Sequence, residues 1–179
     1  MMDGLQRFEV FDLIIIAMTA ALGVAIKPIV VALVHIVTGP LFIPGGALAG
    51  GFYMMWLVLG AALVKKRGTA TLIALVQSLI VIVTGSYGSH GVISLLTYTL
   101  PGVTVDVMLG LLPQAPDEKL AMFAGGIGAN VCGVVLANLV FFRLPLFPLL
   151  LVVGAGALSG ALGGLLAWLL NERIKKMII

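Results

Sequence analysis

The sequence predicts an all-α membrane protein, folded as a bundle of six transmembrane helices. The chain has 179 residues, of which 61% are hydrophobic and only 9% are charged. Its mean hydropathy is +1.24, and a soluble domain needs far more polar side chains than this to cover its core. The few basic residues cluster at the ends of apolar runs, where they orient membrane helices. No polar linker interrupts the chain, so we expect residues 1–179 to form a single transmembrane domain.

Breaks in the hydrophobic pattern define six spans, each near the roughly 20 residues needed to cross a bilayer. The first span covers residues 9–26, and we expect Pro28 to break or kink the helix before a second apolar stretch. A loop rich in Gly and Pro follows at residues 38–46. Asp117 is the predicted N-cap of the fifth span. The other five predicted spans are residues 47–64, 69–83, 92–112, 118–142 and 145–170.

The distribution of lysine and arginine predicts the orientation of the bundle. With the N-terminus inside the cell, the outer ends of the spans keep only Lys27 and Arg143. Cytoplasmic ends are enriched in basic residues, so both termini are predicted to be cytoplasmic. The basic residues on the predicted inner side are Arg7, Lys65, Lys66, Arg67, Lys119, Arg173, Lys175 and Lys176.

Small residues recur at four-residue spacing on two of the predicted helices. Such stripes allow helix backbones to approach closely in lipid. We interpret the glycines of the fifth and sixth spans as packing within the bundle; those of the sixth are Gly156, Gly160 and Gly164. The first span carries Ala17, Ala21 and Ala25. For this alanine stripe, packing within the bundle and docking onto a partner membrane protein are both open.

The outer third of the bundle is predicted to contain a small-molecule pocket, because polar side chains gather there among aromatic rings. The tyrosines also fit an interfacial aromatic belt. His90 lies in a glycine-rich turn at residues 85–91, where the backbone could approach a ligand closely. The candidate substrate-binding residues are Lys27, His35, Thr38, Tyr53, Tyr87, His90, Ser94, Tyr98 and Asn138.

The predicted pocket contains no carboxylate. All seven acidic residues of the chain lie on the inner side or in the inner half of a span in this topology. A cationic ligand would find no acidic partner, so the pocket favours a neutral or anionic ligand. Asp106 is the one carboxylate inside a span, and it fits either an interhelical hydrogen bond or a ligand or proton site. Gln77 and Asn130 are interpreted as interhelical hydrogen-bonding residues.

Motifs of enzymes, metal sites and nucleotide sites are absent from the sequence. We therefore expect no catalytic activity, no cofactor, no metal site and no binding to nucleic acid. Two alternatives remain open. One is a membrane-embedded enzyme acting on a lipid or quinone, which would need Asp106 and His90 close together although about 20 Å of helix separates them. The other is a small channel or assembly subunit.

The alanine stripe, the Gly- and Pro-rich outer loop and the polar outer pocket resemble the substrate-binding S component of an energy-coupling factor (ECF) vitamin transporter. Residues 52–112 are most similar to the hydroxymethylpyrimidine/thiamin type. Gln77 stands where that subgroup has an acidic residue, which disfavours cationic thiamin and leaves a neutral pyrimidine open. The residues that carry this likeness are Trp56, the Lys65-Lys66-Arg67-Gly68 turn, Ala70, Ala74-Leu75-Val76, the 85–91 loop and Asp106.

The resemblance implies a function and its partners. Such a subunit captures a small vitamin or vitamin precursor at the outer face of the membrane. It then delivers the ligand inward together with a transmembrane coupling subunit and two ATP-binding-cassette ATPases, by toppling in the lipid bilayer. The resemblance also implies that Ala17, Ala21 and Ala25 form the docking surface, and that the loop at residues 37–46 gates the pocket.

Overall fold

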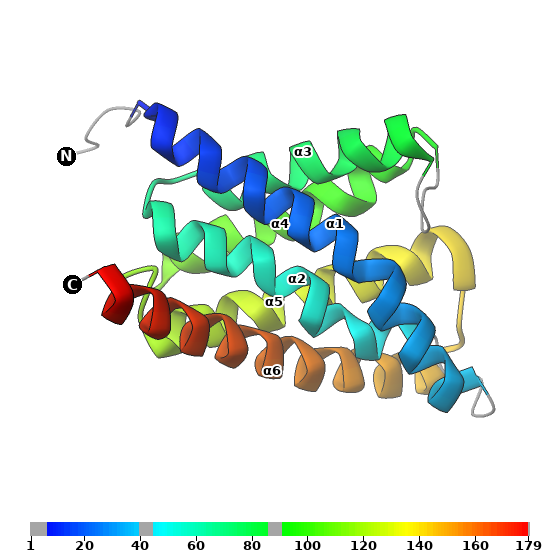
Figure 1. Cartoon of the computed structure of the whole chain (residues 1–179). Coiled ribbons are helices and arrows are strands. Elements are labelled where there is room, and N and C mark those ends of the chain that lie inside the picture. The colour runs from blue at the N-terminus through cyan, green and yellow to red at the C-terminus, as the bar shows by residue number, and fades with distance from the viewer. Residues whose placement is uncertain (1–6, 40–44, 86–90, 179) are drawn as a thin grey trace.

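The computed structural model describes residues 7–39, 45–85 and 91–178 (Figure 1). Within these ranges the chain forms six α-helices and one short π-helix, which confirms the predicted all-helical bundle. The elements in chain order are α1 (Val10–Thr38), α2 (Gly45–Val64), α3 (Thr69–Thr84), α4 (Ser94–Leu111), α5 (Lys119–Ala137), η2 (Asn138–Phe142) and α6 (Leu146–Ile178).

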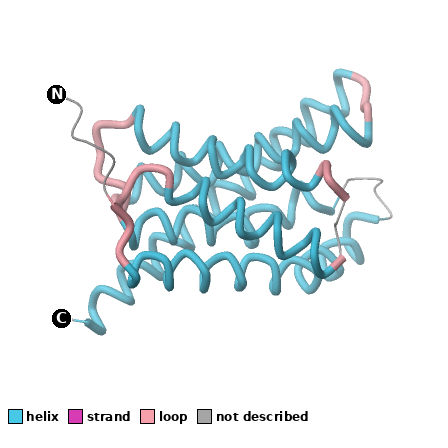
Figure 2. Tube along the Cα trace, turned by 90° about the horizontal axis from the view of Figure 1, so that it is seen from above, coloured by secondary structure: helices cyan, strands magenta, loops and turns pink. Residues whose placement is uncertain are grey.

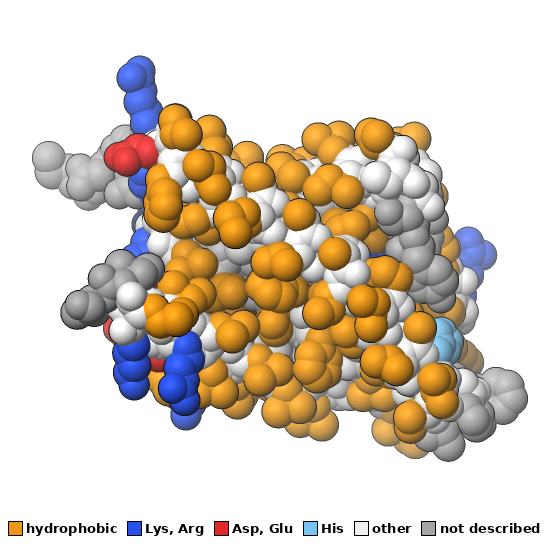
Figure 3. All heavy atoms as spheres, in the orientation of Figure 1, with side chains coloured by type: hydrophobic (Ala, Val, Ile, Leu, Met, Phe, Trp, Pro, Cys, Tyr) orange, Lys and Arg blue, Asp and Glu red, His pale blue; other side chains and the backbone are white. Residues whose placement is uncertain are grey.

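Five of the six α-helices are long and apolar enough to cross a membrane. The exception is α3, whose 16 residues span about 24 Å. Apolar side chains cover the face shown in Figure 3, and the charged side chains in view lie at its two ends. Exposed leucine, isoleucine, valine and phenylalanine side chains are numerous on α1, α4 and α6. A surface of this kind needs lipid as its solvent, and the chain is a multi-pass membrane protein.

Helix α2 lies at the centre of the bundle and packs against α1, α3, α5 and α6. Most of its residues are buried, from Gly45 at its start to Val64 at its end. The remaining helices surround it, with α3 against α4, α4 against α5 and α5 against α6. Figure 2 shows the loops gathered at the two ends of the bundle, with both chain ends on one side.

Close contacts between backbones hold α6 against α5 and α2. A Cβ atom placed on Gly126 of α5 would lie only 2.8 Å from the backbone nitrogen of Gly164. On the other side of α6, the N–H of Gly51 donates a hydrogen bond of 3.0 Å to the hydroxyl of Ser159. That hydroxyl donates in turn to the carbonyl oxygen of Leu48 at 2.5 Å. The glycines of α5 and α6 therefore do pack within the bundle, as interpreted from the sequence.

Of the two outcomes predicted for Pro28, the break is wrong, because α1 is one continuous helix through this residue, and the kink stays a prediction. Proline removes a single N–H donor from the helical ladder, and buried Gly23 and Val31 anchor α1 on both sides of it. The 29 residues of α1 give a length of about 43 Å, which exceeds the hydrocarbon thickness of a bilayer and requires tilt. Pro101 likewise lies inside α4 without ending it, and α6 continues beyond residue 170 to Ile178.

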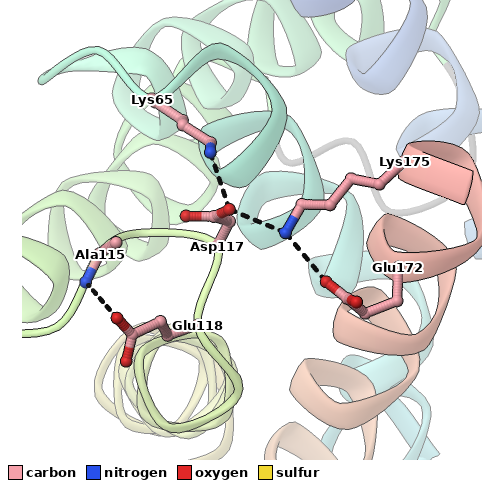
Figure 4. Close-up of polar contacts among 6 residues, drawn as sticks. All are labelled: Lys65, Ala115, Asp117, Glu118, Glu172 and Lys175. Carbon is pink, nitrogen blue, oxygen red and sulfur yellow. Dashed lines mark hydrogen bonds and ion pairs between the residues drawn. The ribbon is translucent and has the colours of Figure 1, made fainter. Parts of the chain in front are cut away.

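Asp117 is not the N-cap of α5; Glu118 occupies that position. Asp117 instead accepts from Lys65 Nζ at 2.7 Å and from Lys175 Nζ at 2.8 Å, and Lys175 also pairs with Glu172 (Figure 4). Burial opposes ionisation of Asp117, but the hydrogen bonds from Lys175 and Lys65 outweigh it and lower the pKa of this carboxyl to about 2. Two ammonium groups bind a carboxylate more strongly than one backbone N–H does, which explains why Asp117 joins three segments of chain.

Asp106 of α4 makes an interhelical hydrogen bond, one of the two roles considered from the sequence. Its carboxylate accepts from the N–H and hydroxyl of Thr71 at 2.8 and 2.6 Å, and from the N–H of Ala70 at 3.3 Å. These donors lie in the first turn of α3, where helical N–H groups lack partners within their own helix. Asp106 therefore caps α3 from a neighbouring helix.

The two ends of the bundle differ in charge. We call the end that contains the 65–68 turn, the 112–118 turn and the last turns of α6 the charged end. Lys66 Nζ contacts Asp12 there at 2.6 Å, and the Asp117 cluster lies at the same end. The opposite end, where α1 ends and α2 begins, is here called the pocket end.

Candidate ligand-binding site

A cavity of about 550 Å³ opens at the pocket end. All six α-helices and η2 contribute to its wall, and carbon atoms make up most of it. This volume and lining are typical of sites that enclose small organic molecules. The polar and aromatic side chains in the wall are Lys27, His35, Tyr53, Gln77, Thr97, Tyr98, Asn130, Asn138, Phe141 and Phe142.

Lys27 is the only lysine or arginine in the wall of this cavity among the described residues. It donates a hydrogen bond to the hydroxyl of Tyr98. Its Nζ lies 4.2 Å from the centroid of the Tyr98 ring and 5.3 Å from that of Tyr53. The four ion pairs of the described residues involve other side chains. Two aromatic faces therefore stabilise the ammonium group in place of a carboxylate.

Tyr53 and His35 complete the part of the wall that surrounds this cation. The Tyr53 hydroxyl donates to the carbonyl oxygen of Gly46 at 3.1 Å, which fixes the tyrosine across the first turns of α2. His35 lies eight residues after Lys27 on α1, about 12 Å further along the helix axis. The cavity therefore extends from Lys27 towards the pocket end, with His35 nearer its mouth.

Three buried polar atoms of the wall have no hydrogen-bond partner within the described part of the chain. They are Nε2 of Gln77, Oγ1 of Thr97 and Oδ1 of Asn130. The side-chain nitrogen of Asn130 is fully used, because it donates to the carbonyl oxygens of Ala47 at 2.9 Å and Gly156 at 2.7 Å. A buried polar atom without a partner is costly. Nε2 of Gln77 packs against Gly23, and Oδ1 of Asn130 packs against Gly50.

Five of the nine predicted substrate-binding residues line the cavity, namely Lys27, His35, Tyr53, Tyr98 and Asn138. Thr38 and Ser94 are buried but do not form part of the wall. Tyr87 and His90 lie outside the described residues, as do residues 40–44 of the loop expected to gate the pocket.

Sequence reasoning missed Gln77, Thr97 and Asn130 as cavity residues. The signal was present, because polar residues within an apolar span mark functional positions as often as packing ones. Asn130 does join α5 to α2 and α6, as interpreted, and its side-chain oxygen packs against Gly50. Asn138 also both lines the cavity and holds the chain together. Its side-chain oxygen accepts a hydrogen bond from the N–H of Leu144 at 2.8 Å.

Ala17, Ala21 and Ala25 are all exposed, on the side of α1 away from buried Ala20 and Gly23. The stripe therefore does not pack within the bundle. It is flanked by exposed apolar side chains such as Leu13, Met18 and Leu22. This surface of small side chains is open to lipid or to another protein.

No group of three His, Cys, Asp or Glu side chains that could hold a metal ion occurs among the described residues. Cys132 is a free thiol that does not line the cavity, and His35 is the one described histidine in the wall. The described donors are amides, hydroxyls and one ammonium group, which suit an organic molecule better than a metal ion.

Three comparisons with known proteins bear on this architecture. A crystal structure described as that of an S-component of ECF transporter superposes with a TM-score of 0.77 and 15% sequence identity. The superposition covers 97% of this chain and 88% of that one. No curated protein matches the chain. A family profile described as "ABC-type cobalt transport system, permease component" matches residues 11–132, which is more than half of the chain. The chain therefore belongs to this family of transport-system membrane components, and it has the fold of an ECF transporter S component.

Proposed function

We propose that this chain is the substrate-binding membrane subunit of an ECF-type importer and that it captures a small vitamin or vitamin precursor. The observation that carries the proposal is the cavity of about 550 Å³, whose mostly apolar wall also contains Lys27 and several uncharged polar side chains. The fold and the family description support the transport class. The chain has no nucleotide-binding motif, so a coupling subunit and two ATP-binding-cassette ATPases would supply the energy for transport.

The charge asymmetry of the bundle supports an orientation with both termini in the cytoplasm. The charged end holds the clusters around Lys65, Lys66 and Lys175, and basic residues favour the cytoplasmic side. The cavity would then open to the outside, where an importer meets its substrate. Arg143 is exposed in the loop after η2, at the pocket end.

The exposed alanine stripe is the proposed docking surface for the coupling subunit. Ala17, Ala21 and Ala25 offer no side chain beyond Cβ, so a partner helix could approach the α1 backbone closely. Ala25 is level with Gly23 and Lys27, which line the cavity, but Ala25 is exposed and Gly23 is buried. Ligand binding and partner docking would therefore use different faces of the same helix.

A small neutral or anionic organic molecule is the proposed ligand, of which a hydroxymethylpyrimidine-like compound is one example. The family description names cobalt, but the described wall offers a single histidine and no carboxylate or thiol for a metal ion. The enzyme alternative receives less support, because Asp106 is engaged in capping α3 and does not line the cavity.

Native mass spectrometry and small-molecule extraction of the purified protein test this proposal. We expect the wild type to release a small metabolite and Ala137→Trp to release none, because Ala137 lines the cavity. The matched control is Leu162→Trp, which adds the same ring to an exposed position of α6. Equal yields of the metabolite from all three proteins would contradict binding in the cavity.

A further inference from the structure

We infer that the ligand carries one carboxylate group, which is bound by the ammonium group of Lys27. This inference rests on the proposed function, because it names the class of molecule that the cavity captures. It is carried by the charge balance of the cavity.

Among the described residues, the positive charge of Lys27 has no counter-charge in the cavity wall. Their carboxylates lie at the charged end or, for Asp106, against the first turn of α3. Residues 40–44 and 86–90, which lie outside the described ranges, contain no Asp or Glu. A cation removed from water is costly without an anionic partner, and tyrosine faces offset only part of that cost. An anionic ligand would provide the missing charge.

Gln77 is an uncharged polar residue of the wall near this cation. Its side chain, which is only 6% exposed, packs with Nε2 against Gly23 of α1. Gly23 precedes Lys27 by one helical turn, which is about 6 Å along the axis. Gln77 therefore adds no charge that could balance Lys27.

The number of charges distinguishes a carboxylate from a phosphate. Lys27 is the single lysine or arginine in the described wall, so it balances one negative charge. A phosphate monoester carries close to two charges at neutral pH, and phosphate sites normally use arginine forks or helix N-termini. A permanently cationic ligand would instead meet Lys27 with a charge of the same sign.

The size of the cavity limits the rest of the ligand. A small cyclic acid fits a volume of about 550 Å³.

Matched pairs of acid and amide test the inference on the full chain in lipid nanodiscs. The probes are 4-aminobenzoate with 4-aminobenzamide, and 2-aminopyrimidine-5-carboxylate with its carboxamide, each measured by calorimetry and by thermal shift. We expect the wild type to bind an acid about tenfold to a hundredfold more tightly than the matching amide, as hydrogen bonds to a charged group allow. The Lys27→Met variant should lose this preference, and Lys27→Arg should keep part of it.

Two further variants control for folding and for general charge. Lys119→Met removes a lysine at the charged end, where Nζ lies 5.3 Å from the Trp168 ring, and should leave the preference unchanged. Gln77→Glu places a carboxylate beside Lys27 and should abolish binding of the acids while the protein stays folded by its thermal transition.

The outcomes separate this inference from the proposed function. Equal binding of acid and amide, unaffected by Lys27→Met, would overturn the carboxylate assignment and leave a small-molecule site in place. A neutral or cationic metabolite extracted from the wild type would do the same. If no probe stabilises the protein and no metabolite is extracted, both the carboxylate assignment and the binding-subunit proposal are wrong.

Discussion

The carboxylate of Asp106 on α4 accepts two hydrogen bonds from Thr71 on α3, one from its N–H at 2.8 Å and one from its hydroxyl at 2.6 Å. This contact joins neighbouring helices at the point where α3 begins. We predict that Asp106→Ala destabilises the protein by about 1–2 kcal/mol, the usual cost of losing a helix cap. Asp106→Asn should cost less, because an amide oxygen still accepts.

Thermal unfolding in detergent or nanodiscs would measure the change. Binding of ligand should be unaffected in Asp106→Ala at temperatures where the variant is folded, because Asp106 does not line the cavity. A loss of affinity without a loss of stability would show that Asp106 belongs to the ligand site after all.

Gly126 provides the second prediction, because a Cβ atom there would meet the α6 backbone at 2.8 Å from Gly164 N. Gly126→Ala should destabilise the bundle by about 1–3 kcal/mol, the usual cost of overpacking. The control is Gly154→Ala on α6, where nothing lies within 4 Å of an added Cβ. Alanine favours a helix over glycine by about 0.5–1 kcal/mol, so the control should be neutral or stabilising. Similar melting temperatures for the two variants would contradict the packing argument.

The exposed alanine stripe gives a prediction about transport. Ala17→Trp and Ala21→Trp should leave ligand binding intact and abolish uptake, because a bulky ring prevents a partner helix from reaching α1. Copurification with the coupling subunit and uptake by whole cells measure the two effects. Leu158→Trp, on an exposed part of α6, should change neither. Normal copurification of the Ala17→Trp protein would refute the docking surface.

We predict that the stability of the protein depends on pH through the carboxyl group of Asp117. Its pKa is lowered from 3.8 to about 2 in the folded protein. A carboxyl whose pKa falls on folding stabilises the protein fully above its unfolded value and loses that effect as pH falls through the folded value. The melting temperature of Asp117→Asn should therefore lie below that of the wild type at pH 5–7. The gap should shrink from about pH 4 to pH 2.

Differential scanning calorimetry across this pH range checks the prediction. Lys65→Met removes one of the two cations that contact Asp117, while Lys175 remains at 2.8 Å. This variant should show the same trend with a smaller amplitude. A gap between wild type and Asp117→Asn that stays constant down to pH 2 would show that Asp117 contributes no charge-dependent stability.

The sequence predicted the helices well where a local pattern decided them. The lengths of the apolar runs, and the glycines and prolines between them, predicted where α2 to α6 begin. Each predicted start lies within a few residues of the observed one. Pro28 and Asp117 misled the prediction, because each has a strong local preference that tertiary contacts override. Buried neighbours keep α1 continuous through Pro28, and two lysines distant in sequence hold Asp117 away from a capping position.

The sequence alone determined that this protein lies in lipid and that its cavity holds no negative charge. Composition demands lipid, and the placement of seven acidic residues leaves none for the pocket end. Only the tertiary structure decided which polar side chains lack partners. Hydrogen bonds between helices depend on which helix faces meet. In this fold Asp106 accepts from the first turn of α3, and the side-chain nitrogen of Asn130 donates to the backbone of α2. The fold also placed Nε2 of Gln77 against Gly23 of α1, with no hydrogen-bond partner in the described ranges.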